Sequence, residues 1–244
     1  MMKQLHWTDF DAVAFDVEGT LADTIPTHHT SRIQAFQDHG YGHITHEEHQ
    51  LASTYGSSTE DITGGVLHAA GEIEKDGPFK HHPVVQKVAA TKIQLFEQLA
   101  ASGFHEMPRA ADFVKSIAAK FEGRMALVTS SPERFVLPFL DRYDLAKYFP
   151  GELIISEDTV MMLGLEGKPS PDPYKLAMQR LQSKKLLVFE DTVPGAAAAK
   201  AAGATVIALG FELHNTELFK VGNIPYPPDV LVSSYVEAKE LLGL

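Results

Sequence analysis

The sequence contains no cysteine. This absence excludes a disulfide framework, a zinc–thiolate site and a cysteine nucleophile. Basic residues are also scarce, because 21 lysines and arginines stand against 32 aspartates and glutamates, which gives a formal net charge of −11. A chain with this excess of negative charge is a poor partner for nucleic acid or for an anionic membrane.

Long apolar runs are missing as well. No stretch approaches the roughly 20 apolar residues that are needed to cross a bilayer. Residues 1–11 are polar and acidic, unlike the apolar centre of a secretory signal. We therefore expect a soluble, cytoplasmic protein whose partners include neither nucleic acid nor membrane.

Short apolar runs recur along the 244 residues, and helical patterns lie between them. The runs do not alternate with polar residues, as expected for parallel strands that are buried on both faces. Strand–helix alternation predicts an α/β fold with a mostly parallel sheet. The predicted strands are 13–15, 125–128, 153–155, 186–189, 206–209 and 230–232, and the predicted helices between them are 109–120, 133–142, 173–181 and 195–202.

Residues 25–103 break this alternation, because they contain helical patterns only. The predicted helices are 27–39, 45–52, 59–70 and 83–101, and Thr45 with Glu48 forms a capping box at the start of the second one. We predict an all-helical cap domain at 25–103. It is inserted into a catalytic core that comprises 1–24 and 104–244.

The most informative stretch is Phe-Asp-Val-Glu-Gly-Thr-Leu-Ala-Asp-Thr at residues 15–24. It places Asp16 and Glu18 two residues apart at the end of the first predicted strand. Side chains at i and i+2 of a strand point the same way, so both carboxylates can face one ligand. One can then act as a nucleophile while the other transfers protons. The alternative is a strand-to-turn junction with two solvated acids.

Three further segments after apolar runs carry polar residues suited to phosphate or metal. Thr129 and Ser130 offer hydroxyl groups to a phosphoryl oxygen, or alternatively cap the next helix. Lys168, in a proline-rich loop, can neutralise a phosphate and a carboxylate together, although most lysines are solvated. Glu190 and Asp191 supply hard oxygen ligands suited to Mg²⁺, or else complement a helix dipole.

In chain order, Asp-x-Glu-Gly-Thr, Thr-Ser, Lys-Pro-x-Pro-Asp-Pro and Glu-Asp resemble the motifs of the haloacid dehalogenase superfamily of phosphoryl-transfer enzymes. The chain is most similar to the branch with a helical cap after the first strand, which contains sugar-phosphate phosphatases and β-phosphoglucomutases. The resemblance implies a Rossmann-like core. It also implies that Asp16 is the nucleophile, that Glu18 is the acid/base and that Thr129 binds the phosphoryl group.

The resemblance further implies that Lys168 orients the reactants and balances their charge. It implies a Mg²⁺ cofactor, bound by Asp16, Glu190, Asp191 and the backbone carbonyl of Glu18. Phosphoryl transfer depends mostly on positioning and charge neutralisation, which this set of residues would provide.

Several positions depart from the branch or match it only in part. Glu18 stands where the family usually has aspartate, and its extra methylene group weakens a mutase more than a phosphatase. His28 has the spacing of a histidine that couples cap closure to the acid/base in β-phosphoglucomutases. Thr59 stands in place of their phosphate-binding arginine. Lys92 is a candidate cap lysine or else a surface lysine, and it joins Ser130, His28 and Thr59 as candidate substrate-binding residues.

We therefore predict a Mg²⁺-dependent phosphatase that hydrolyses a small phosphorylated metabolite, a sugar phosphate, through an aspartyl-phosphate intermediate. A monomer or a weak homodimer is expected. One alternative is a phosphohexomutase. The other is a catalytically weakened phosphate-binding or regulatory protein, with Glu18 as the lesion.

Overall fold

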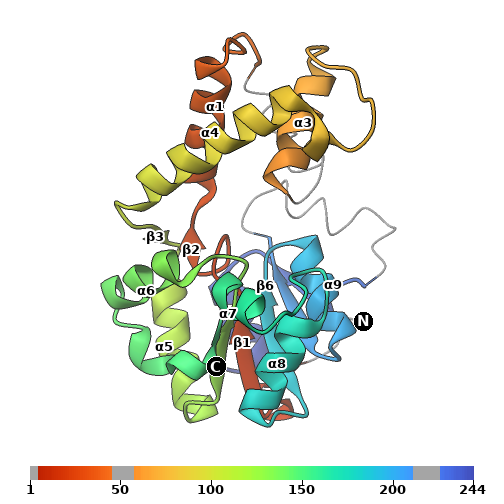
Figure 1. The fold of residues 1–244 in the computed structure, drawn as a ribbon. Helices are drawn as coiled ribbons and strands as arrows, with labels where there is room; N and C mark the ends of the chain where they lie inside the picture. The colour runs from red at the N-terminus through yellow and green to blue at the C-terminus, as the bar shows by residue number, and fades with distance from the viewer. Residues whose placement is uncertain (1–4, 46–57, 211–225) are drawn as a thin grey trace. The chain divides into compact units, whose positions relative to one another are not determined.

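Among residues 5–45, 58–210 and 226–244, which the computed structural model describes, six parallel strands form one sheet (Figure 1). Their order in the sheet is β5-β4-β1-β6-β7-β8, so β1 lies between β4 and β6. Phe15 of β1 is in register with Leu127 on one side and with Phe189 on the other. The strands are β1 (Ala12–Phe15), β4 (Met125–Val128), β5 (Ile154–Ile155), β6 (Leu186–Glu190), β7 (Thr205–Leu209) and β8 (Val230–Val232).

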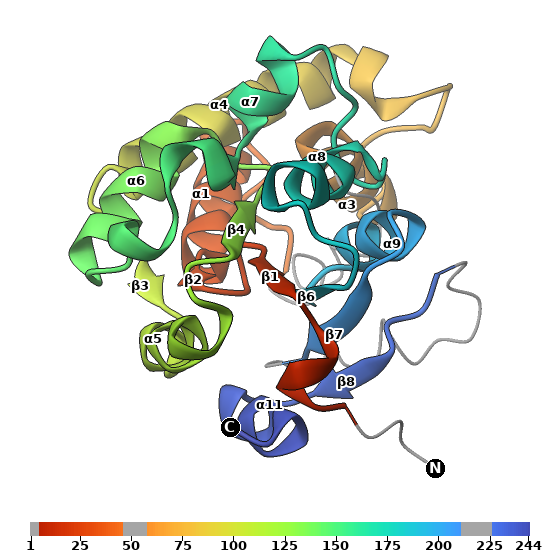
Figure 2. The same ribbon diagram turned by 90° about the horizontal axis from the view of Figure 1, so that it is seen from below.

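Helices cover both faces of this sheet, which explains why its strands are apolar without alternation. In Figure 2, α8 (Asp172–Leu181) and α9 (Val193–Ala201) lie on one side of the sheet, and α5 (Ala110–Phe121) and α11 (Tyr235–Leu242) lie on the other. Two more helices, α6 (Glu133–Arg142) and α7 (Glu157–Met162), follow β4 and β5 in the sequence. The predicted α/β fold with a mostly parallel sheet is confirmed.

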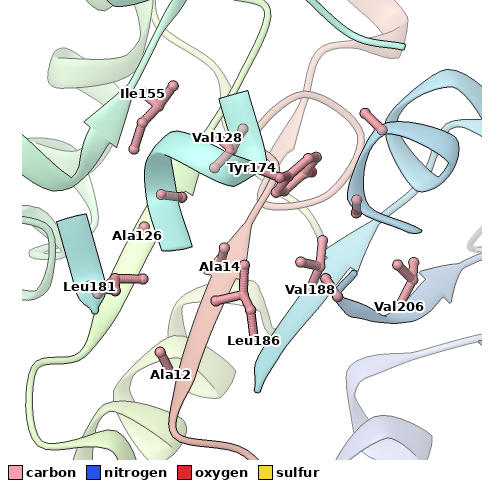
Figure 3. Packing of buried hydrophobic residues seen from close by; sticks show 14 of the residues in the cluster. Ala12, Ala14, Ala126, Val128, Ile155, Tyr174, Leu181, Leu186, Val188 and Val206 are labelled. Atoms are coloured by element: carbon pink, nitrogen blue, oxygen red, sulfur yellow. The ribbon is translucent and has the colours of Figure 1, made fainter. Parts of the chain in front are cut away.

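The two sheet faces have different cores. Small and aliphatic side chains of the strands, such as Ala14 and Val188, pack against Tyr174 and Leu181 of α8 and against the alanines of α9 (Figure 3). On the other face, Phe15 stacks on Phe189 with ring centroids 5.1 Å apart. The chain runs from β5 through α7 to α8 and from β6 to α9, so it leaves both strands at their carboxyl ends before it enters α8 and α9.

The chain divides into two compact units, of which the larger contains Met1–Asp23 and Phe104–Leu244 and the smaller contains Thr24–Gly103. In the larger unit, β2 (Ala22–Asp23) pairs antiparallel with β3 (His105–Glu106). These two strands are not among the predicted ones, since two residues are too few to show a period. Helices α7 and α11 were not predicted either.

The smaller unit is helical in its described part. It contains α1 (Ile25–Asp38), α3 (Thr59–Ala69), the 3-10 helix η3 (Phe79–His81) and α4 (Pro83–Ala100). Its core joins Phe36 of α1, Leu67 of α3 and Val88 of α4, all fully buried. The helix predicted at 45–52 lies, except for its first residue, outside the described residues. None of the described helices has the length and apolar character that a bilayer-spanning helix requires.

Candidate active site

The carboxyl ends of β1, β4 and β6 bring the strongest sequence candidates together. Asp16 directly follows β1, and its backbone N–H donates to the carbonyl of Phe189 in β6 at 3.0 Å. Thr129 directly follows β4, and its backbone N–H donates to the carbonyl of Ile155 in β5 at 2.9 Å. Glu190 is the last residue of β6. Strand pairing thus fixes the backbones of all three residues at one edge of the sheet.

Lys168 reaches this edge from the loop that precedes α8. Its ammonium group donates to Asp16 Oδ1 at 2.6 Å, to Glu190 Oε1 at 2.6 Å and to the carbonyl of Val128 at 2.8 Å. An ammonium group has three N–H donors, so this lysine is fully bonded. Its side chain is 6% exposed, which makes the ion pair with Asp16 a buried one and excludes a solvated lysine.

The carboxylate of Glu190 is held on both oxygens. Oε1 accepts from Lys168 and from the hydroxyl of Tyr174 at 3.1 Å, while Oε2 accepts from the backbone N–H groups of Asp191 and Thr192 and from the Thr192 hydroxyl. A Cβ at Gly195 would collide with this carboxylate, so glycine is required there. Glu190 therefore anchors Lys168 and the start of α9, whether or not it also binds a metal.

Asp191 completes a cluster of buried carboxylates with Asp16 and Glu190. One ligand atom from each residue lies within 4.8 Å of the others. Thr20 donates from its hydroxyl to Asp191 Oδ1 at 3.0 Å. Gly19 has a φ of 74°, and a Cβ at this position would collide with Asp191. The Gly-Thr turn of the first motif thus makes room for this carboxylate and orients it.

The electrostatics of the cluster fit a divalent cation. Three buried carboxylates face one ammonium group, and a hard cation with oxygen ligands would neutralise the remaining charge. Burial raises the pKa of Asp16 to about 7, although the Lys168 charge opposes this rise. Burial, followed by the charges of Asp16 and Glu190, raises the pKa of Asp191 well above its ordinary value.

The same carboxylates determine the charge of Lys168. Burial opposes the charged form, but Asp16 and Glu190 outweigh it and raise the pKa of Lys168 well above its ordinary value. The lysine is therefore a permanent cation across the physiological pH range. A cation at this place can neutralise an incoming anion as well as the carboxylates.

Glu18 lies in different surroundings from Asp16, since it is half-buried and its carboxylate accepts a hydrogen bond from the Ser131 hydroxyl. The backbone N–H of Ser131 donates in turn to Thr129 Oγ1 at 3.1 Å. Thr129 is buried, and as an acceptor in this bond it keeps its own O–H for another acceptor. The segment after β4 therefore links Thr129 to Glu18 through Ser131.

Ser130, the predicted neighbour of Thr129, is exposed and forms no hydrogen bond within the described part of the chain. Its assignment to the substrate stays a prediction. Ser131 was not among the residues predicted from the sequence. Side chains two apart on a strand point the same way, and this rule, which was applied to Asp16 and Glu18, would have selected Ser131 together with Thr129. Tyr174 was missed because an aromatic residue in a helix resembles ordinary core.

In the helical unit, the structure brings His28 and Lys92 together. Lys92 Nζ and His28 Nδ1 are 2.9 Å apart, and both side chains pack on the ring of Phe96. Lys92 is 8% exposed, so the surface-lysine alternative is wrong. Thr59 is the first residue of α3 and takes no part in this contact.

Comparison with known proteins agrees with this arrangement. A family model described as haloacid dehalogenase-like hydrolase matches residues 10–203. A phosphoglycolate phosphatase of Vibrio parahaemolyticus is 27% identical over 241 residues, which cover 97% of each chain. A phosphorylated carbohydrates phosphatase of Thermotoga maritima is 32% identical over 197 residues, or 79% of this chain and 82% of that protein.

Among solved structures, a mutant of CbbY from Rhodobacter sphaeroides in complex with xylulose 1,5-bisphosphate has a TM-score of 0.67 and 26% sequence identity. The match covers 96% of this chain and 100% of that one. The likeness therefore extends over both units and not only over the sheet.

Proposed function

Since the chain belongs to the haloacid dehalogenase-like hydrolases, we propose that it is a Mg²⁺-dependent phosphatase that works through an aspartyl-phosphate on Asp16. The observation that supports this proposal best is the buried ion pair between Asp16 and Lys168, 2.6 Å long, beside the carboxylates of Glu190 and Asp191. A nucleophilic carboxylate must stay ionised and must meet an anionic substrate. Lys168 serves both needs.

The buried carboxylates fit the cofactor. Asp16 and Asp191 would hold Mg²⁺, with Glu190 as a further candidate ligand and the backbone carbonyl of Glu18 as the predicted fourth. When bound, the ion offsets the negative charge of the transferring phosphoryl group as a Lewis acid.

In the first step, a carboxylate oxygen of Asp16 attacks phosphorus in line and the bond to the leaving oxygen breaks. The carboxyl group of Glu18 gives its proton to that oxygen, so that the product leaves as an alcohol. Thr129 donates its hydroxyl hydrogen to a phosphoryl oxygen. Ser131 holds Glu18 in place through its hydroxyl.

In the second step, the Glu18 carboxylate accepts a proton from a water molecule, whose oxygen attacks phosphorus. The bond between Asp16 and phosphorus breaks and inorganic phosphate leaves, which restores both carboxyl groups to their starting states. Lys168 stays bonded to Asp16 throughout and limits the movement of the nucleophile.

We further propose that the helical unit serves as a cap that excludes bulk water and selects the substrate. The curated relatives are named for phosphoglycolate and for phosphorylated carbohydrates. We therefore propose a small phosphorylated metabolite as substrate, with 2-phosphoglycolate and sugar phosphates as the first compounds to assay.

The test measures phosphate release from these compounds with Mg²⁺ and with a chelator, for the native protein and for Asp16→Asn. We expect release that requires Mg²⁺ and that the Asp16→Asn protein lacks. Asp141→Asn, an exposed substitution of the same kind on α6, is the matched control. Rapid quenching followed by peptide mass spectrometry should find a phosphoryl adduct on the peptide that contains Asp16. Undiminished hydrolysis by Asp16→Asn would exclude Asp16 as the nucleophile.

A phosphohexomutase is the second candidate, and the contact between His28 and Lys92 favours it. The two activities differ in their products from a hexose 1-phosphate. A phosphatase yields free hexose and inorganic phosphate, whereas a mutase yields an isomeric hexose phosphate.

A further inference from the structure

Tyr235 on α11 contacts the Gly-Thr turn of the first motif from the other end of the chain. Its ring is buried and stacks on Phe113 of α5, with ring centroids 4.5 Å apart. Its hydroxyl donates to the backbone carbonyl of Thr20 at 2.8 Å. Burial, followed by the charges of Asp191 and Asp16, raises the pKa of Tyr235 well above its ordinary value. The phenol therefore keeps its proton and acts as a donor.

Thr20 depends on this bond for the position of its backbone. It is fully buried, and within the described part of the chain no backbone N–H donates to its carbonyl. The turn is closed around it instead, because the N–H of Gly19 donates to the carbonyl of Ala22 at 2.8 Å. A buried carbonyl without a donor is unfavourable. The hydroxyl of Tyr235 is thus the group that satisfies and fixes the peptide carbonyl of Thr20.

Thr20 in turn orients a carboxylate of the proposed metal site. Its hydroxyl donates to Asp191 Oδ1 at 3.0 Å. Asp191 belongs to the buried cluster with Asp16 and Glu190. Residues that hold a metal ligand without touching the metal fix the direction of that ligand, and their loss typically costs about tenfold to a hundredfold in metal affinity. The bonds from Tyr235 to Thr20 and from Thr20 to Asp191 form one chain of contacts that ends at this cluster.

We propose that Tyr235 is a positioning residue of the metal site, which holds Thr20 so that its hydroxyl keeps Asp191 in place to bind Mg²⁺. This inference rests on the Mg²⁺ site of the proposed function. Tyr235 lies outside residues 10–203, the part of the chain that the family model matches. Its role follows from the packing of α11 against the first motif and not from a motif of the family.

The test measures Mg²⁺ affinity by calorimetry, which needs no turnover. For Tyr235→Phe we expect the dissociation constant of Mg²⁺ to rise by roughly tenfold. Thr20→Val, which removes the hydroxyl that donates to Asp191, should raise it by at least as much. Tyr143→Phe is the matched control. It removes a hydroxyl that accepts from the backbone N–H of Glu106 at 3.0 Å, a bond outside this chain of contacts, and should leave the affinity unchanged.

A double variant tests whether Tyr235 acts through Thr20. If it does, adding Tyr235→Phe to Thr20→Val should weaken Mg²⁺ binding little beyond Thr20→Val alone, since coupled residues are not additive. Thermal melts without metal check that each variant is folded, and Tyr235→Phe keeps the ring that packs on Phe113. An unchanged Mg²⁺ affinity of Tyr235→Phe would overturn the proposal, because a merely structural hydroxyl would leave that affinity as it is. Fully additive losses in the double variant would overturn it as well.

Failure of the proposed function gives a different result. A native protein that binds no Mg²⁺ would contradict the cofactor proposal and this inference together. A native protein that binds Mg²⁺ but releases no phosphate would contradict the phosphatase proposal alone. In that case the Mg²⁺ affinities of Tyr235→Phe and of the double variant still decide whether Tyr235 positions the site.

Discussion

The stability of the metal-free protein should fall as the pH rises from about 4 to about 7. Asp16 has an ordinary pKa of 3.8, and in the folded protein burial raises it to about 7. The folded state therefore binds a proton that the unfolded state has already lost in this range. A carboxyl group whose pKa is raised by folding makes its full contribution to stability below the pKa that it has in the unfolded state. This contribution is lost as the pH rises through the pKa that it has in the folded state.

The magnitude follows from the size of the shift. The difference between 3.8 and about 7 is about three pKa units, and each unit corresponds to 1.36 kcal/mol, so Asp16 costs on the order of 4 kcal/mol above pH 7. For a domain of this size, 1 kcal/mol moves the melting temperature by about 2–4 °C. At pH 8 the Asp16→Asn protein should thus melt roughly 8–16 °C above the native protein when metal is absent. At pH 4 the two should be similar.

Thermal melts in a chelating buffer from pH 4 to pH 8, repeated with excess Mg²⁺, measure this effect. A bound cation favours the ionised carboxylates, so Mg²⁺ should stabilise the native protein most at the high end of this range. It should stabilise Asp16→Asn less. If the melting temperatures of the two metal-free proteins depend on pH in the same way, the argument that burial raises the pKa of Asp16 is refuted. An equal effect of Mg²⁺ on both proteins would refute Asp16 as a ligand.

Two further predictions concern residues around the carboxylates. Gly195→Ala should lower the free energy of unfolding by about 1–3 kcal/mol, because its Cβ would overlap the Glu190 carboxylate. Denaturant titration checks this, with Gly151→Ala as a control, since no atom lies within 4 Å of a Cβ there. Ser131→Ala should lower kcat by about tenfold with little change in KM, because Glu18 loses the hydroxyl that holds it. Steady-state kinetics checks this, and a raised KM with unchanged kcat would contradict it.

The sequence predicted the sheet and the strand-end residues for a common reason. Apolar runs such as 125–128 and 186–189 are buried on both faces, and a polar residue directly after such a run must lie at the edge of the sheet. Asp16, Thr129 and Glu190 follow from this rule alone. Lys168 lies in a loop, and the family resemblance, rather than the apolar runs, predicted that it balances charge at the active site.

Other parts of the site depend on packing that no local pattern shows. Tyr174 has the helical spacing and the burial of a core residue, yet its hydroxyl reaches Glu190. Periodicity reports only which face of the helix is buried, and it does not show where the polar end of a buried side chain lies.

Glu18 stands where the family usually has aspartate, and its surroundings help to decide whether this difference weakens the site. A glutamate one methylene longer than the usual aspartate would be a lesion if its carboxylate moved freely, since a misplacement of about 1 Å can cost about a hundredfold in rate. Ser131 fixes the Glu18 carboxylate, and the backbone of Ser131 is bonded to Thr129. The proposed acid/base is thus tied to the residue that would bind the phosphoryl group. Its half exposure lets it exchange protons with water, which the buried Asp16 does less easily. This division favours a working phosphatase over a weakened phosphate binder.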